Sequence, residues 1–269
     1  MTNGSKKETP VRKNNLKARL KQGERVLGTM ITIFDNPEIA KILKVCGFDY
    51  FIVDCEHGGF NYGAVANILA MARETGIAGV VRVPEPKREV VLKFMEMGAT
   101  GLLLPNTDTP EQARALVEYS KYLPMGKRGV SLMRPHTGFE KIESAHQYMQ
   151  DSNADTLLMA QVESPLSVKN VEAILDVEGI DAAFIGPNDL SQNMGIYGQF
   201  AHPEFIAALD HVIASARNAG KFSGIHLMSS ASLKPWIDKG MTLNLCGNDA
   251  DLMMKAARAA IAEVNAAAK

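Results

Sequence analysis

Eight short segments of the chain are almost continuously apolar, and each is bounded by polar or turn-forming residues. A strand with one solvated face alternates between apolar and polar residues, whereas a strand that is buried on both faces is apolar throughout. These segments therefore predict parallel strands that are covered by protein on both sides. They are residues 26–33, 49–54, 78–83, 100–105, 156–163, 180–186, 222–228 and 242–246.

Segments with a helical pattern of apolar and polar residues lie between these strands. Three of them begin where a polar residue precedes a proline, which is a helix-start signal: Asn36-Pro37, Thr109-Pro110 and His202-Pro203. An amphipathic stretch, Leu16 to Leu20, precedes the first strand, and residues 249–267 predict a long final helix. Eight strands that alternate with helices over 269 residues predict an α/β fold, a (βα)₈ TIM barrel with an N-terminal helix.

No linker or shift in composition divides the chain, so we expect residues 1–269 to form one domain, with residues 1–14 as a flexible tail. Two connections are longer than a barrel requires: residues 124–155 between strands four and five, and residues 186–200 after strand six. Long connections are usually lids or binding segments. For the second half of 124–155, an ordinary excursion with its own helical turn is an equal alternative.

Charge and composition exclude several classes of protein. The 29 Lys and Arg residues nearly balance 30 Asp and Glu, so the net charge of −1 gives no attraction to nucleic acid or to an anionic membrane. No apolar window is long enough to span a membrane, and the polar, basic N-terminus lacks the apolar core of a secretory signal. Cys46, Cys55 and Cys246 show no CxxC spacing, which argues against a disulfide framework or structural zinc. We expect a cytoplasmic protein that acts on small molecules.

Polar and charged residues gather where the predicted strands end. In a TIM barrel, function sits at the loops that follow the strands. A charged group at the end of a buried strand is costly unless it is paired or binds a ligand. Singly, each of these residues could be a helix cap or part of a salt bridge, but together they predict a site. They are Asp54, Glu56, His57, Arg82, Gln161, Glu163, Gly186, Pro187, Asn188, Asp189, His226, Asn248 and Asp249.

Glu163 and Asp189 are the natural ligands of a hard divalent cation, because two carboxylates with open positions for water and substrate oxygens suit Mg²⁺ or Mn²⁺. The alternative is that Glu163 caps the helix after it and that Asp189 caps a turn starting at Leu190. Arg82 presents a planar fork for a substrate carboxylate. The alternative role of Arg82 is a salt bridge inside the barrel, with Glu56 as a partner.

His57 carries an imidazole suited to acid–base chemistry near neutral pH, with a structural role as the alternative. His226 ends strand seven, and its spacing alone does not place it at the site. We interpret Cys55 as a small buried hydrophobic residue rather than a nucleophile. The sequence contains no dinucleotide-binding fingerprint or phosphate-binding loop, and no lysine ends a strand, which disfavours Schiff-base chemistry.

The chain resembles the HpcH/HpaI family of class II pyruvate aldolases, from about Leu16 to the C-terminal helix. The matching sequences occur in the family order: DCEHGG, VVRV, GATGLLLP, RGV, QVES, DVEGIDAAFIGPNDLS and HPEF. DxEH, QxE and GPxDLS at strand ends are a specific combination. The resemblance, which extends to 4-hydroxy-2-oxoheptanedioate and 2-keto-3-deoxy sugar acid aldolases, implies a TIM barrel that joins or separates pyruvate and an aldehyde. It also implies a divalent metal ion (Mg²⁺, Mn²⁺ or Co²⁺).

The resemblance further implies a role for individual residues. His57 matches the family's catalytic base, which acts through a water, and Arg82 matches the arginine that binds the pyruvate carboxylate and stabilises the enolate. Glu96, where many members have Asp, matches the acid that raises the basicity of the histidine. The implied metal ligands are Glu163 and Asp189, and the implied substrate-binding residues are Arg82, Gln161, Gly186, Pro187, Asn188 and Asp189. The family is typically hexameric, a trimer of dimers with the last helix exchanged between subunits, which implies a homohexamer.

Three features depart from the family pattern. The first strand lacks a Trp near its end, Pro84 follows Arg82 by two residues rather than one, and Ser131 stands where Gly is common. The resemblance implies that they lie where the aldehyde binds, so the identity of the aldehyde stays open.

Two alternatives to the aldolase remain at this point. The same site could serve another lyase reaction, such as decarboxylation of an oxaloacetate-type acid or lysis of an acyl-CoA, although the latter needs a cationic channel that the sequence does not show. A barrel that binds an oxo acid without turnover is the other alternative. The intact set of His57, Arg82, Glu163 and Asp189 argues against it.

Overall fold

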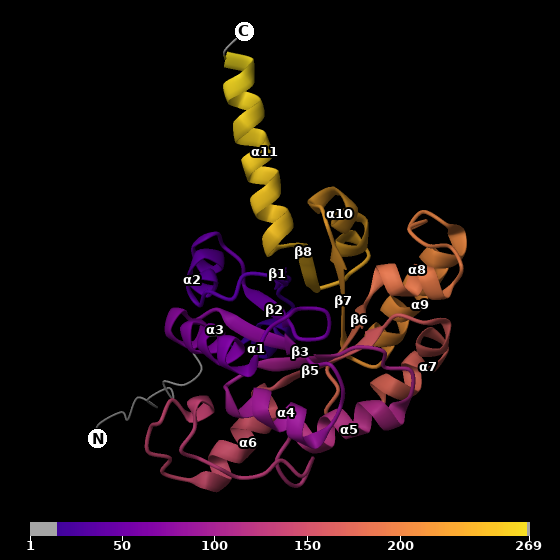
Figure 1. Ribbon diagram of the computed structural model, residues 1–269. Helices are drawn as coiled ribbons and strands as arrows, with labels where there is room; N and C mark the ends of the chain where they lie inside the picture. The colour runs from indigo at the N-terminus through magenta and orange to yellow at the C-terminus, as the bar shows by residue number, and fades with distance from the viewer. Residues whose placement is uncertain (1–14, 268–269) are drawn as a thin grey trace, which may run out of the picture.

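The structure, a computed structural model, describes residues 15–267 and contains the predicted closed barrel (Figure 1). Its strands follow one another in sequence order, all neighbours are parallel, and β1 pairs with β8 to close the sheet. All eight predicted strands are confirmed, whereas the expected tail at residues 1–14 lies outside the described residues. The strands are β1 (Val26–Ile31), β2 (Tyr50–Asp54), β3 (Ala78–Arg82), β4 (Gly101–Leu104), β5 (Leu157–Val162), β6 (Ala182–Ile185), β7 (Phe222–Leu227) and β8 (Leu243–Asn248).

Helices connect the strands and cover the outside of the barrel (Figure 1). The N-terminal helix and the long final helix are both where the sequence predicts them. The helices are α1 (Leu16–Lys21), α2 (Glu38–Val45), α3 (Tyr62–Thr75), α4 (Arg88–Glu96), α5 (Pro110–Ser120), the 3₁₀ turn η1 (Pro135–Thr137), α6 (Ala145–Asp155), α7 (Pro165–Leu175), α8 (Pro187–Asn193), α9 (Pro203–Asn218), α10 (Ser230–Asp238) and α11 (Asp249–Ala267).

The predicted helix-start signals act as caps in the structure. Thr109 and Gln112 form a reciprocal capping box at the start of α5, and Nδ1 of His202 accepts from the backbone N–H of Glu204 at 3.3 Å at the start of α9. At α2 the helix begins one residue later than Pro37, and Oδ1 of Asn36 accepts from the backbone N–H of Glu38 at 3.0 Å. Each signal therefore supplies an acceptor to an otherwise unpaired N–H group of the first turn.

The barrel has two apolar layers that follow from the alternation of side chains along each strand. Ala78 and Val80 belong to a cluster inside the barrel, whereas Val81 packs in the cluster between the strands and the helices. The same alternation directs Arg82, the next inward position of β3, into the barrel at the carboxyl end of the strand. Polar residues at these last inward positions therefore face one another at this end of the barrel, which we call the mouth.

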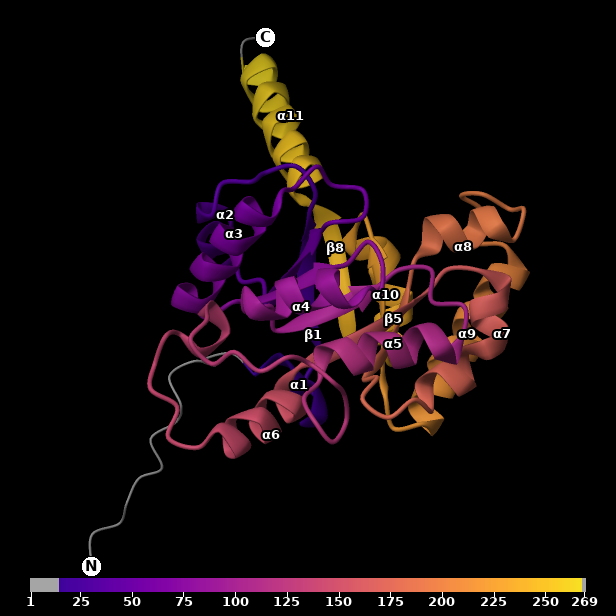
Figure 2. The same cartoon turned by 60° about the horizontal axis from the view of Figure 1, so that its bottom comes forward.

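The long connection 124–155 does not form the lid that we considered. It contains η1 and α6, and it packs against the end of the barrel opposite to the mouth, where Asn15 donates to Asp155 at 2.8 Å and Lys121 donates to the Asn153 carbonyl at 2.6 Å. Figure 2 shows α6 beside α1, far from α11. The alternative, an excursion with its own helix, is what the structure shows. The connection after β6 does lie at the mouth, where it forms α8.

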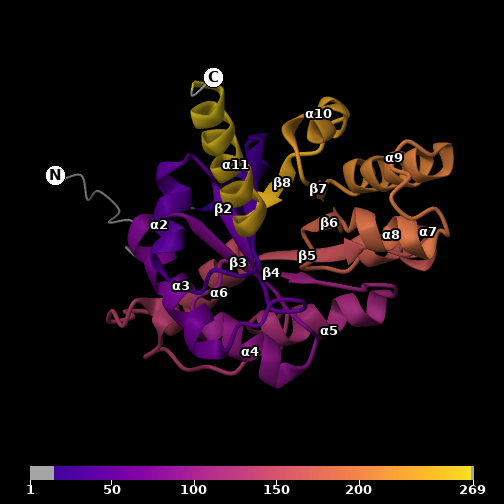
Figure 3. The ribbon, with the colours of Figure 1, turned by 45° about the horizontal axis from the view of Figure 1, so that its top comes forward.

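Helix α11 extends away from the barrel (Figure 3). Of its residues, only Asp249 is buried, and Met253, Ile261 and Val264 are exposed although they are apolar. These three side chains fall on one face of a helix, because they are spaced by eight and three residues. Within residues 15–267, no helix combines the length and the apolar content needed to cross a bilayer.

Asp249 connects the end of β8 to the loop that follows β1. Its carboxylate accepts hydrogen bonds from the backbone N–H groups of Thr32, Ile33 and Phe34 at 3.1, 3.0 and 2.8 Å, and from the Thr32 hydroxyl at 2.7 Å. Burial alone would raise the pKa of Asp249, but the hydrogen bonds from Phe34, Ile33 and Thr32 outweigh it, so the pKa lies below its ordinary value. This carboxylate therefore reinforces, at the mouth, the closing edge that the pairing of β1 with β8 forms.

We predict that Asp249→Ala lowers the free energy of unfolding by about 2 to 4 kcal/mol, because several hydrogen bonds to a charged group are lost. Since the folded state lowers the pKa of Asp249, the stabilisation is complete above about pH 4 and is lost as the pH falls through the lowered value. Urea unfolding followed by circular dichroism measures both effects. Asp210→Ala, which removes an exposed ion pair with Lys239, is the matched control and should cost less than about 1 kcal/mol. Equal losses in the two variants would contradict the prediction.

Candidate active site

A cavity of ≈ 250 Å³ opens at the mouth of the barrel. Side chains from the ends of several strands and from α8 line it, as expected for parallel strands whose carboxyl ends converge. Of the residues with a predicted catalytic, substrate-binding or metal-binding role, all except Glu96 and Glu163 are part of this lining. The other predicted strand-end residues Asp54, Glu56, Asn248 and Asp249 do not line it, whereas His226 does. The lining residues are Met30, His57, Arg82, Gln161, Phe184, Ile185, Gly186, Pro187, Asn188, Asp189 and His226.

Two carboxylates hold Arg82 at the wall of this cavity. Its Nε and Nη2 donate to Oδ1 and Oδ2 of Asp54 at 2.9 and 2.6 Å, and its Nη1 lies 3.1 Å from Oε2 of Glu56. Asp54 and Arg82 are direct partners across β2 and β3, so strand register sets this pairing. Burial alone would lower the pKa of Arg82, but the hydrogen bond and charge of Asp54 raise it. The salt bridge that we considered as an alternative is therefore present, and it fixes the orientation of a charged guanidinium that also lines the cavity.

His57 lies at the rim of the cavity, and its side chain is 66% exposed. The backbone N–H groups of Glu56 and His57 donate to Oδ1 of Asp54 at 3.0 and 3.2 Å. Its Nε2 lies 3.9 Å from Oε2 of Glu56. Asp54 therefore positions both Arg82 and the loop that carries His57. An imidazole in this place can exchange protons with water and with a group in the cavity.

Glu163 is buried directly behind the cavity wall. Its Oε1 accepts from the backbone N–H of Asn106 at 2.5 Å, and its Oε2 accepts from Nε2 of Gln161 at 2.5 Å. Burial and the nearby charge of Asp189 raise the pKa of Glu163 to about 7 despite these hydrogen bonds. The helix after it is capped by Ser164, so the alternative role of Glu163 as a helix cap is not what the structure shows.

Gly186 leaves the space that Glu163 occupies. A β-carbon at position 186 would lie 2.3 Å from Oε2 of Glu163 and 2.8 Å from Nε2 of Gln161. Both distances are shorter than real β-carbon contacts, so any side chain here would displace the Glu163 carboxylate and the Gln161 amide. Glycine at this position therefore lets the Glu163 carboxylate and the Gln161 amide reach the edge of the cavity.

Asp189 lies in the first turn of α8 and lines the cavity beside Glu163. The helix is preceded by Gly186 and has no side-chain cap, so Asp189 does not play the capping role that we considered. The two carboxylates are close enough that the charge of Asp189 raises the pKa of Glu163.

The side chains at this edge fit a hard divalent cation. Glu163 and Asp189 supply carboxylate oxygens, and Oε1 of Gln161 is a buried oxygen that has no hydrogen-bond partner. Among residues 15–267, no three His, Cys, Asp or Glu side chains are grouped closely enough to hold a metal on their own. Mg²⁺ and Mn²⁺ accept such a partial set, because water and substrate oxygens complete their coordination.

Sequence reasoning missed the supporting roles of Asp54 and Asn106, whereas it named Glu56 as an alternative partner of Arg82. Asp54 was noted at the end of β2, but only the strand register shows that it faces Arg82. Asn106 has a left-handed φ of 48°, which Asn tolerates better than most residues, and it also donates through Nδ2 to Glu56 at 3.2 Å. An Asn just after an apolar strand is a turn signal that could have indicated such a backbone.

The structure does not bring Glu96 to His57, so the implied partnership of these residues is absent within one chain. Glu96 is the last residue of α4, and a helix of this fold ends near the beginning of the next strand, at the barrel end opposite to the mouth. There its Oε1 accepts from Nη2 of Arg128 at 2.8 Å and lies 3.4 Å from Nε2 of His136. The long connection 124–155 therefore supplies the partners of Glu96.

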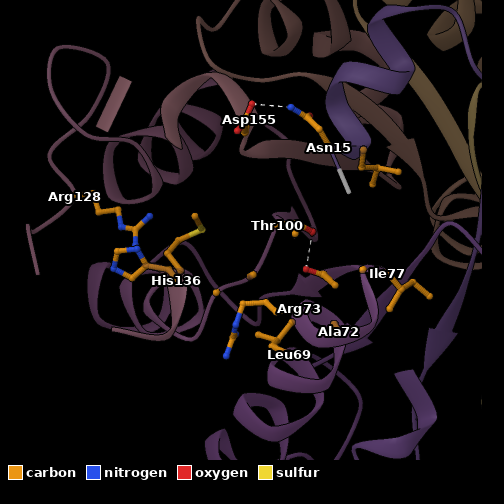
Figure 4. A pocket seen from close by; sticks show the side chains of 15 residues that line it. Asn15, Leu69, Ala72, Arg73, Ile77, Thr100, Arg128, His136 and Asp155 are labelled. Carbon is orange, nitrogen blue, oxygen red and sulfur yellow. Dashed lines mark hydrogen bonds between the residues drawn. The ribbon is translucent and has the colours of Figure 1, made fainter. Parts of the chain in front are cut away.

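A second, smaller hollow lies at that opposite end of the barrel (Figure 4). Arg128 and His136 lie at one side of it, Arg73 and Ile77 lie at another, and Asn15 donates to Asp155 across its edge. None of the predicted site residues lines it. Arg128 and His136, the partners of Glu96, thus line a hollow that shares no lining residue with the cavity at the mouth.

Cys55 follows Asp54 but does not act as a nucleophile. Burial, together with the charge of Asp54, raises the pKa of its thiol to about 12, so the thiol stays protonated near neutral pH. Cys46, Cys55 and Cys246 are all free. The interpretation of Cys55 as a small buried residue agrees with this environment.

Comparison with known proteins places this geometry in a family. A family model described as HpcH/HpaI aldolase/citrate lyase matches residues 30–256. The chain is 33% identical over 236 residues to 5-keto-4-deoxy-D-glucarate aldolase of Klebsiella pneumoniae subsp. pneumoniae, covering 88% of this chain and 91% of that protein. It is 32% identical to hydroxypyruvate/pyruvate aldolase of Roseobacter denitrificans, over 86% of this chain and 89% of that protein.

A solved structure extends the similarity to the fold. The HpcH/HpaI aldolase from Desulfitobacterium hafniense DCB-2 superposes with a TM-score of 0.89 at 31% identity, over 93% of this chain and 96% of that one. The family match therefore covers the end of β1, all of β2 to β8 and the residues that line the mouth. The chain belongs to the HpcH/HpaI aldolase/citrate lyase family and is a carbon–carbon lyase.

Proposed function

We propose that the protein is a divalent-metal-dependent aldolase that reversibly cleaves a 4-hydroxy-2-oxo acid into pyruvate and an aldehyde. The observation that carries the proposal is the arrangement at the mouth, where the fixed guanidinium of Arg82 faces a small cavity shared with Asp189 and backed by Glu163. The family match and the aldolase relatives support the same reaction class.

Glu163 and Asp189 are the residues that would hold the metal ion. Bound there, a divalent cation supplies a Lewis acid that polarises the 2-oxo group and stabilises the enolate charge. Asn106 and Gln161 orient the Glu163 carboxylate through their hydrogen bonds, and Gly186 leaves it room. These supporting contacts fix ligand geometry, on which metal affinity depends.

Arg82 binds the pyruvate carboxylate in this proposal and keeps a positive charge where negative charge develops. Because Asp54 already orients the guanidinium, little reorganisation accompanies the reaction, which makes such a charge effective. Gln161, Pro187 and Asn188 line the same cavity and complete the binding site for the oxo acid.

His57 is the proposed base. In the cleavage direction it takes the proton of the 4-hydroxyl group through a water, the bond between C3 and C4 breaks, and the aldehyde leaves. Its exposure at the rim suits this role, because the aldehyde half of the substrate lies between the pyruvate site and the solvent. Glu96 has no part in the proposed step within one chain, since Arg128 pairs with it at the opposite end of the barrel.

We also propose that residues 1–269 form one barrel domain in the cytoplasm. The eight strands follow one another in sequence order from Val26 to Asn248 and form one barrel, which supports one domain. The three free cysteines are typical of a reducing compartment.

Exchange of the pyruvate methyl protons in D₂O, followed by NMR, tests the enolate directly. We expect exchange with Mg²⁺, Mn²⁺ or Co²⁺ and none with EDTA. Glu163→Ala should lose Mn²⁺ affinity and exchange together, because it removes a ligand. Arg82→Ala should slow exchange by about 100-fold or more while its Mn²⁺ affinity, measured by calorimetry, stays within about threefold. Glu111→Ala, which removes an exposed ion pair with Arg114, is the control.

No exchange with any of the three metals would refute the proposal, and equal losses of affinity and exchange in Arg82→Ala would refute its assigned role. Exchange without release of pyruvate from a 4-hydroxy-2-oxo acid would favour the decarboxylase alternative instead.

Asp54→Asn tests whether Asp54 acts through Arg82. We expect it to slow exchange by about 10- to 100-fold, as for other groups that orient a binding residue. In an Arg82→Lys background, which cannot form the same two-point contact, Asp54→Asn should slow exchange by less than threefold. Exchange rates of the four proteins give the coupling directly. Equal factors in the two backgrounds would show that Asp54 does not act through Arg82.

We propose that α11 assembles the protein into a homo-oligomer, a hexamer of the trimer-of-dimers type. The exposed apolar face formed by Met253, Ile261 and Val264 supports the exchange of this helix between copies of the chain. The double variant Met253→Lys/Ile261→Lys should dissociate the assembly, because two charges enter an apolar contact. Light scattering after size exclusion measures the mass, and Glu263→Lys on the same helix is the control. A monomeric unaltered protein would contradict this proposal.

A further inference from the structure

The proposed reaction assigns no role to His226, which is a polar residue at the mouth. It lies near the end of β7, and its ring lines the same cavity as Arg82 and Gln161. On the same strand, Phe222 packs with the cluster inside the barrel, whereas Ile225 and Leu227 pack with the outer cluster. Alternation therefore directs His226 inward, as it directs Arg82.

A bulge in β8 fixes the orientation of the His226 ring. The register between β1 and β8 shifts after Gly28, and Gly247 has a left-handed φ of 66°, which glycine adopts at little cost. The Gly247 carbonyl consequently accepts two hydrogen bonds, from the Thr29 hydroxyl at 3.1 Å and from Nε2 of His226 at 2.9 Å. Because a carbonyl only accepts, Nε2 carries the proton.

The other ring nitrogen, Nδ1, is consequently an acceptor, and it belongs to a residue that lines the cavity. The described residues offer it no hydrogen-bond partner, and it is not among their buried, unsatisfied nitrogen and oxygen atoms. It is therefore accessible. Burial, together with the charge of Arg82, lowers the pKa of His226, so the neutral ring with its lone pair on Nδ1 is the form present near neutral pH.

Apolar side chains also line the cavity that His226 lines. Phe184 comes from β6, which is next to β7, and Met30 comes from β1, which β8 separates from β7. The charged groups Arg82 and His57 come from β3 and from the loop after β2. Beside Phe184, His226 is thus a polar side chain that can distinguish a polar substituent of the substrate from an apolar one.

We propose that His226 is a specificity-determining residue that accepts a hydrogen bond from a hydroxyl group of the substrate, through Nδ1. The protein then favours hydroxylated substrates over those that carry hydrogen or a methyl group at the same position. This inference rests on the proposed aldolase function. The hydroxyl belongs either to the oxo acid or to the aldehyde, and the two are separated by experiment.

Two series of reactions measure the preference. The first compares exchange of the C3 protons of hydroxypyruvate and pyruvate in D₂O, which needs no aldehyde. The second compares kcat/KM for the addition of pyruvate to glycolaldehyde and to acetaldehyde. We expect the unaltered protein to favour the hydroxylated member of at least one pair. Metal-dependent exchange of pyruvate in the unaltered protein is measured first, so failure of the proposed function is recognised before the preference is scored.

Two variants of His226 separate hydrogen bonding to substrate from support of Gly247. In His226→Asn the amide lies near the position of Nδ1, so an acceptor remains in the cavity while the bond to Gly247 is lost. In His226→Gln the amide reaches toward Gly247, so that bond is replaced while the acceptor at Nδ1 is lost. His226→Leu removes both, and His211→Leu, at an exposed position of α9, is the control.

We expect His226→Gln and His226→Leu to reduce the preference for the hydroxylated substrate by about tenfold, and His226→Asn to keep it within about threefold. Thermal unfolding monitors the folding of each variant, and the Asn and Gln variants decide the matter if His226→Leu does not fold. A preference kept in His226→Gln but lost in His226→Asn would show that the residue only supports Gly247. Absence of any preference in both series would also overturn the proposal.

Discussion

A closed parallel barrel leaves the side chains of each strand only two directions, inward or outward, and this constraint determines where the site is built. The inward positions along most of each strand are apolar and fill the barrel. At the last inward positions the side chains become polar: Asp54 on β2, Arg82 on β3, Gln161 on β5 and His226 on β7. Because closure brings these strand ends together, residues separated by more than a hundred positions in the chain share one cavity.

At the mouth, acidic side chains outnumber the positively charged side chain of Arg82. Arg82 faces Asp54 and Glu56, and the same region also contains Glu163 and Asp189. The ion pair with Arg82 stabilises the charge of Asp54. Burial raises the pKa of Glu56 and also that of Glu163. A chain with a net charge of −1 thus concentrates negative charge at one edge of its cavity. That surplus supports the proposal of a cation at this edge.

Much of the fold could be predicted, because burial on both faces gives each strand a continuous apolar run and each helix start has its own polar signal. The site was predictable to the extent that its residues end those runs, as Glu163 and His226 do. What the sequence could not give was contact between segments. The support of Glu163 by Asn106 depends on a left-handed backbone, and the pairing of Asp54 with Arg82 depends on strand register.

The positions of Glu96 and of the connection 124–155 also could not be predicted from the sequence. Both lie at loops in the sequence, and a pattern of polar residues does not reveal which end of a barrel a loop covers. The ion pair between Glu96 and Arg128 places residues of this connection at the end opposite to the mouth. The direction in which a strand or helix runs therefore determines which end of the barrel a loop covers, and residue type alone does not show this.

Gly186 has a consequence for how this pocket can diversify. Any side chain at this position would collide with the Glu163 carboxylate, so mutation there cannot reshape the cavity without disturbing its charged edge. Met30 and Phe184 line the same cavity through apolar side chains that carry no charge. Changes in the range of accepted molecules, in natural descendants or in engineered libraries, are therefore far more accessible through positions 30 and 184 than through position 186.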